Sequence, residues 1–199
     1  MRRLTLVAIV AIGCFLFSIP SFAQEVIYPK AEVFGGFSIS SLAAPPSLTG
    51  LPTSLRETFW GWQASGNFNV THYLGIVGDF GGQYKSITAP AIGTTPAISL
   101  GMNNYQLMFG PQISFRRQKV TPFVHAVFGF DRFGASITGV GGSTTGMGMG
   151  MGGGFDINVS DRLALRVPQF DWTPMHIGGV WWNKQVRIGI GLVVKAGGK

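Results

Sequence analysis

The histidines and their acidic neighbours are the residues of this 199-residue chain that could perform catalysis. His72, His125 and His176 lie far apart in the sequence, and no H-E-x-x-H, paired Cys-x-x-Cys or G-x-S-x-G motif occurs. His125 near Asp131 could polarise a hydroxyl group, as in a barrel enzyme that trims lipid acyl chains. A site that acts on lipid should face lipid, and the strand pattern described below turns His125 away from it. We therefore expect a hydrogen-bonded structural histidine and no enzyme, metal or cofactor.

A second motif with possible chemistry is the glycine run at 148–153, which matches G-x-G-x-x-G. A dinucleotide site needs a strand followed by these glycines at the start of a helix. Here the glycines alternate with methionines inside a strand pattern, where they leave room in a narrow interior. We expect no nucleotide site.

Composition excludes several other classes of protein. Charged residues make up 12% of the chain and hydrophobic residues 46%, which excludes a disordered polyelectrolyte. The 30 glycines follow no G-X-Y period, so the chain is not collagen, and a single cysteine excludes a disulfide scaffold or thiolate zinc cluster. The formal net charge is +7, but no basic stripe interleaved with aromatic residues occurs, so no nucleic acid partner is expected.

Alternation of large apolar residues with small or polar ones is the dominant pattern after residue 24. Such a period of two indicates strands whose two faces meet different surroundings. In 105–116, for example, Tyr105, Leu107 and Phe109 share one face and Gln106, Met108 and Gly110 share the other. We expect Pro168 to shift the register of its strand. The pattern predicts eight strands, at 31–39, 60–70, 74–84, 105–116, 122–131, 147–157, 163–167 and 186–194.

The connections between these strands alternate strictly in length. Long loops are expected at 41–57, 86–102, 134–144 and 173–183. Short turns are expected at 70–73, 117–120 and 160–162, and the similar stretches 69–74 and 158–163 occupy two of them. This alternation predicts an all-β, transmembrane, up-and-down antiparallel barrel with short periplasmic turns and long extracellular loops.

The large apolar face is predicted to point outward. Eight strands enclose an interior only just wide enough for side chains, which suits small and polar groups better than many phenylalanines. Unpaired charges in that interior are costly, so we expect them to form ion pairs and to fill the lumen structurally. A small selective channel is the alternative. The predicted luminal polar network is Glu32, Asp79, Arg116, His125, Asp131, Asp156, Arg166 and Arg187.

Tryptophan and tyrosine residues fall mainly at strand ends next to the long loops. Their rings can lie in lipid while the polar atom stays in water, which is typical of membrane interfaces. The predicted interface aromatics are Trp60, Trp62, Tyr84, Tyr105, Trp172, Trp181 and Trp182.

The first segment has the features of a secretory signal. Arg2 and Arg3 precede an apolar stretch, and Ser21-Phe22-Ala23 forms a small-x-small cleavage site. The apolar core is short for the roughly 20 residues that a membrane helix needs. We predict a signal peptide at 1–23 and a barrel domain at 24–199.

Four stretches of the chain resemble the outer membrane protein β-barrel domain family, small eight-stranded barrels like the membrane domain of outer membrane protein A. They are 77–80, 109–116, 120–126 and 152–166. The resemblance implies a protein of the bacterial outer membrane with a role in envelope integrity, surface display or adhesion, and no shared catalytic residues. Such chains usually end on an aromatic residue, whereas this one continues past Val194 to Lys199.

The partners expected for such a barrel are outer-membrane lipids and, during biogenesis, the barrel-assembly machinery. The long loops, rich in Pro, Ser, Thr, Gly and Ala, could bind an extracellular ligand. A soluble or periplasmic lipid-binding barrel is the alternative from another class, and it predicts release without detergent.

Overall fold

The computed structural model describes residues 28–44, 55–89 and 98–197, so the predicted signal peptide at 1–23 lies outside the described residues. Ten β-strands make up a single sheet. The eight long ones are β1 (Ala31–Ala44), β2 (Leu55–Asn69), β3 (Leu74–Ala89), β4 (Ile98–Ser114), β5 (Val120–Ile137), β6 (Val140–Asn158), β7 (Leu163–Trp172) and β10 (Val186–Ala196). The two short ones are β8 (Met175–Ile177) and β9 (Val180–Trp182).

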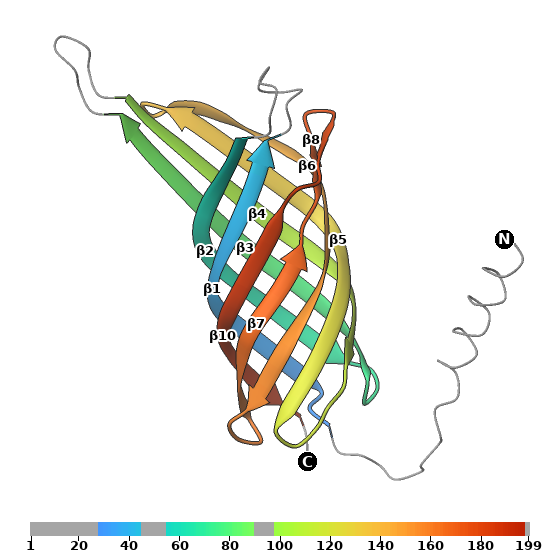
Figure 1. Ribbon diagram of the computed structural model, residues 1–199. Coiled ribbons are helices and arrows are strands. Elements are labelled where there is room, and N and C mark those ends of the chain that lie inside the picture. Colours follow the sequence, from blue (N-terminus) through green and yellow to red (C-terminus); the bar gives the residue numbers. More distant parts are fainter. Residues whose placement is uncertain (1–27, 45–54, 90–97, 198–199) are drawn as a thin grey trace, which may run out of the picture.

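The eight long strands close into a ring (Figure 1). Each pairs antiparallel with its neighbours in the order β5-β4-β3-β2-β1-β10-β7-β6, and β6 pairs again with β5. Contact between the first and last strands closes the sheet, with Phe37 opposite Ile190. Closure leaves no free edge among these strands. The predicted eight-stranded up-and-down barrel is confirmed.

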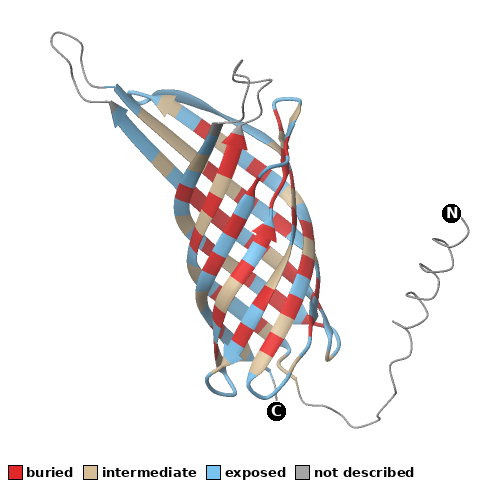
Figure 2. Ribbon diagram, viewed as in Figure 1, coloured by how far each residue is buried: buried red, intermediate tan, exposed pale blue. Residues whose placement is uncertain are grey.

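Burial alternates along each strand, which produces the chequered surface in Figure 2. On β4, Gln106 and Met108 face the interior, whereas Leu107 and Phe109 lie outside. The interior holds mainly amides, hydroxyls and charges, and the outside carries large apolar side chains. This is the reverse of a soluble barrel. Within the described residues, no helix is long and apolar enough to cross a membrane.

Three short turns lie together at one end of the barrel, at 70–73, 115–119 and 159–162. Two of them have the same hydrogen bonds: Val70 donates its backbone N–H to the carbonyl of Leu74, and Val159 donates to that of Leu163, each at 2.9 Å. The predicted short turns therefore occur close to their expected places, and the sequence repeat corresponds to a repeated turn.

The opposite end differs from the long loops that the sequence predicts. The loop expected at 134–144 is wrong: β5 and β6 continue as a hairpin, and its turn is Thr138-Gly139, with φ of 48° and 85°. Positive φ at both central residues matches the twist of a tight hairpin. The loop expected at 173–183 contains the β8–β9 hairpin. Strands also occupy the outer parts of 41–57 and 86–102, while 45–54 and 90–97 lie outside the described residues.

An irregularity in β7 changes which residues face the lumen. Arg166 pairs with Gly191 and Gln169 with Gly189, so three steps along β7 match two along β10. The same offset occurs against β6. The strand therefore carries a β-bulge at Val167-Pro168, in agreement with the register shift expected at proline. Before the bulge even-numbered residues are buried, and after it odd-numbered ones are.

Candidate functional site

The centre of the lumen is an ion cluster around Arg187 of β10. One of its guanidinium nitrogens, Nη2, lies 2.8 Å from Asp79 Oδ1 and 2.8 Å from Asp171 Oδ2. Asp79 projects from β3 and Asp171 from β7, and all three side chains are almost completely buried. A guanidinium held between two carboxylates ties three strands together across the interior.

Neutral groups and one histidine extend this cluster to three further strands. Gln63 of β2 donates its side-chain amide to Asp79, and Gln106 of β4 accepts a bond from Arg187 at 3.2 Å. His125 Nε2 of β5 lies 3.0 Å from Asp171 Oδ1. His125 thus pairs with Asp171, and not with the Asp131 that the rejected enzyme hypothesis placed beside it. Both groups of the histidine–aspartate pair are buried in the lumen.

A second ion pair lies between the cluster and the short turns. Arg166 of β7 donates from Nε and Nη2 to the two oxygens of Asp156 of β6, at 2.7 and 3.0 Å. The rings of Phe34 and Phe123 lie 4.6 and 4.1 Å from its guanidinium carbon. Stacking on both rings and a bidentate carboxylate contact hold this cation rigidly.

A third pair lies next to the short turns. Arg116 is 3.3 Å from Glu32 and also donates to the carbonyl of His72. Asn67 donates its amide to the same carboxylate at 3.2 Å. Partial burial, and then the nearby Arg116 cation, lower the pKa of His72, which lies in the turn outside the membrane-spanning strands.

Asp131 differs from the other buried carboxylates. It accepts a hydrogen bond from Asn104 at 3.3 Å and forms no ion pair within the described residues. A Cβ at Gly148 would lie 2.0 Å from its Oδ2, and one at Gly152 would lie 2.2 Å from Asp171 Oδ1. Two glycines of the 148–153 run, Gly148 and Gly152, thus lie directly against carboxylates, and a side chain at either would displace its carboxylate.

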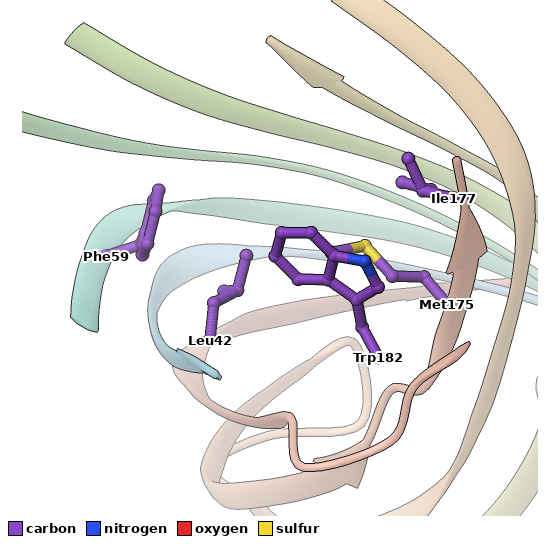
Figure 3. Close-up of a cluster of buried hydrophobic side chains, with 5 residues drawn as sticks. All are labelled: Leu42, Phe59, Met175, Ile177 and Trp182. Atoms are coloured by element: carbon purple, nitrogen blue, oxygen red, sulfur yellow. The ribbon is translucent and has the colours of Figure 1, made fainter. Parts of the chain in front are cut away.

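An apolar cluster fills the mouth of the barrel on the side away from the short turns. Leu42 of β1 and Phe59 of β2 pack from the wall, and the β8–β9 hairpin contributes three more side chains (Figure 3). Trp182 lies in the middle of the cluster and is 8% exposed. Its predicted place at the lipid interface is therefore wrong, because the hairpin turns this ring inward. The hairpin residues of the cluster are Met175, Ile177 and Trp182.

The model of the family described as "Outer membrane protein beta-barrel domain" matches residues 9–193. The protein belongs to this family. A search of the curated proteins finds no match.

Solved structures share the fold of this outer-membrane barrel. The attachment invasion locus protein Ail of Yersinia pestis is 12% identical, with a TM-score of 0.58 over 85% of this chain and 99% of Ail. Neisserial surface protein A is 16% identical, with a TM-score of 0.56 over 83% of this chain and 98% of that protein. Family membership makes the chain an integral protein of the bacterial outer membrane, which argues against the soluble alternative.

The other aromatic residues predicted for the lipid interface of this outer-membrane barrel lie on its outer surface. Trp60, Trp62, Tyr84, Trp172 and Trp181 are exposed, and Tyr105 is half-buried. The Trp62 indole donates to the Tyr84 hydroxyl at 3.4 Å, and that hydroxyl lies 3.2 Å from the hydroxyl of Tyr105. The Trp62 indole nitrogen and the hydroxyl oxygens of Tyr84 and Tyr105 therefore lie close together on the outer surface.

All eight residues predicted for the luminal network lie at inward positions of the barrel, and Arg116 is the least buried of them. Two residues that face the lumen, Gln169 and Asp171, were missed by the reasoning from sequence. Both come after the bulge, and a regular period of two from Arg166 would place them outside. The signal that could have found them is Pro168, since a shift of one residue turns both inward.

Proposed function

We propose that the protein is a non-enzymatic outer-membrane barrel with a structural, surface-display or adhesion role, whose lumen is filled and does not serve as a general pore. The observation that carries the proposal is the ion cluster around Arg187. It joins groups from β2, β3, β4, β5, β7 and β10 across a lumen that only eight strands enclose. A solute would have to break several charge-assisted hydrogen bonds to pass.

The apolar cluster at the mouth supports the same proposal. The β8–β9 hairpin folds inward, so that Met175 is fully buried and Trp182 nearly so. Hydrated ions and polar metabolites are excluded by an apolar constriction, because they would have to shed water there. Two barriers of different chemistry in series argue against the alternative of a small selective channel.

A surface role is supported by what lies at the end opposite the short turns. There the β5–β6 hairpin extends past the ring, with Val140 81% exposed. Ail has been solved in complex with the heparin analogue sucrose octasulfate, which is a ligand of that protein. We infer that the end of this chain opposite the short turns binds an extracellular ligand. We also propose that residues 1–23 are a signal peptide that is removed on export.

Solute flux through the purified protein tests the proposal. The folded barrel is reconstituted into liposomes, and the influx of small sugars and salts is compared with empty liposomes and with liposomes that contain a general porin. We expect influx equal to that of empty liposomes. Sustained influx of any of these solutes would contradict a filled lumen. Gel mobility before and after boiling, taken on the same vesicles, verifies that the barrel is folded.

A further inference from the structure

An open hollow of about 630 Å³ lies on the outer surface of the barrel, over β4, β5 and β6 beyond the apolar band. Its polar side chains are Asn103 and Tyr105 from β4, Arg132 and Ser136 from β5, and Ser143 from β6, and Ala135 also lines it. Gly134 and Gly141 lie between them and contribute no side chain. The polar side chains have the same parity as the lipid-facing residues of their strands, so they line the hollow from its outward side, not from the lumen.

Strand register shows where this hollow lies relative to lipid. Leu107, Phe130 and Met147 form one row across the three strands, and all three are exposed and apolar. The next outward row away from the short turns is Tyr105, Arg132 and Thr145. The outer surface therefore changes from apolar to polar between two consecutive rows, as it does where hydrocarbon gives way to headgroups.

The row above continues the polar surface. It consists of Asn103, Gly134 and Ser143. The side chain of Asn103 lies over Gly134, because a Cβ there would be 2.7 Å from Asn103 Oδ1. Together with the Tyr105 hydroxyl, which lies 3.2 Å from that of Tyr84, these groups offer several hydrogen-bond donors and acceptors around one depression.

Arg132 is the only cation among the residues that line this hollow, and none of these residues is a carboxylate. Its Nε and Nη2 donate to the Ser143 hydroxyl at 3.2 and 2.9 Å, which orients the guanidinium. Within the described residues it forms no ion pair, and the segments 45–54 and 90–97 contain no Asp or Glu. An oriented guanidinium with free donors is suited to phosphate.

We propose that this hollow binds the phosphorylated sugar headgroup of the glycolipid in the outer leaflet. Arg132 contacts a phosphate, Asn103, Ser136 and Ser143 contact sugar hydroxyls, and the acyl chains lie against the apolar row below. Arg132 follows lipid-facing Phe130 by two residues, on the side away from the short turns. Its guanidinium therefore lies at the level of the membrane where this lipid has its phosphates. The inference goes beyond the proposed surface role and does not depend on whether the lumen conducts.

Binding of lipid A to the full-length barrel in detergent micelles tests this proposal. Native mass spectrometry measures the affinity for bisphosphorylated lipid A and for lipid A whose phosphates have been removed. We expect the phosphorylated lipid to bind about tenfold more tightly, as one exposed charge-assisted hydrogen bond would give. Inorganic phosphate at the same concentration should not displace it, because it lacks the acyl chains.

The variants compare two exposed arginines at opposite ends of the barrel. R132Q should abolish the preference for phosphorylated lipid, and R132K should retain part of it, since lysine keeps the charge but not the planar fork. The matched control R117Q, in the turn at 115–119, should bind as the native protein does. Unchanged binding by R132Q, or displacement by inorganic phosphate, would overturn the proposal. Gel mobility before and after boiling verifies that each variant is folded.

Discussion

Arg187 illustrates what a single residue does in this interior. Its guanidinium forms ion pairs with both Asp79 and Asp171. Asp79 also accepts a hydrogen bond from Gln63, and Asp171 also contacts His125. Bringing these charges out of water is costly, and the cost is offset only while every partner is present. The cluster therefore stabilises the barrel as a unit, and the removal of one member should cost more than the removal of several.

Replacement of Arg187 by methionine should destabilise the barrel by about 3–5 kcal/mol, because two buried carboxylates lose their cation. Unfolding by urea in lipid vesicles, followed by tryptophan fluorescence, measures the free energy of unfolding. The triple variant R187M with D79N and D171N should recover most of the loss, since it removes both carboxylates that pair with Arg187 together with their cation.

The matched control is R162M, which removes an exposed arginine from the turn at 159–162. It should change the free energy of unfolding by less than about 0.5 kcal/mol. If R187M unfolded with the same free energy as R162M, or if the triple variant were less stable than R187M, the cluster would not have the role assigned to it.

Strand β7 shows how one element determines the content of the lumen. Its bulge at Val167-Pro168 contains one residue more than either neighbouring strand, and this extra residue sends Gln169 and Asp171 inward. Removal of the extra residue would let β7 pair continuously with β6 and β10 while Asp171 stays inside. Removal of a residue beyond the bulge would instead turn Asp171 toward lipid.

Deletion of Pro168 should therefore give a barrel that assembles, whereas deletion of Phe170 should not. Both variants shorten β7 by one residue, but only the deletion of Phe170 turns Asp171 toward lipid and Trp172 toward the lumen. Gel mobility before and after boiling reports assembly into the outer membrane. Loss of assembly in the Pro168 deletion, with assembly in the Phe170 deletion, would contradict the register described for this strand.

The same elements show how far the sequence alone can predict this fold. Alternation placed Asp79 and Arg187 inside, because uninterrupted strands between lipid and lumen carry a strict period of two. It could not place Asp171, since proline indicates an irregularity but not the number of extra residues. It also missed the extension of β5 and β6 to Thr138-Gly139, because both faces of that hairpin meet water and the apolar alternation ends there.

At the scale of the whole molecule, the two ends of the barrel differ in construction. One end has three tight turns, and the other has the β5–β6 and β8–β9 hairpins. The apolar outer band fixes the barrel in the bilayer, and insertion of short turns first carries fewer polar groups across the membrane than insertion of extended hairpins. The hairpin end should therefore face the cell exterior.

Cysteine labelling of intact cells measures this orientation. Val140, beside the tip of the β5–β6 hairpin, and Ser160, in a turn at the other end, are both exposed and can each be replaced by cysteine. Cys14, the one native cysteine, lies within the predicted signal peptide, so no other thiol should react in the exported protein. A membrane-impermeant maleimide should label V140C in intact cells and S160C only after the outer membrane is broken. Labelling of S160C alone in intact cells would require the opposite orientation, and the hollow around Arg132 would then face the inner leaflet.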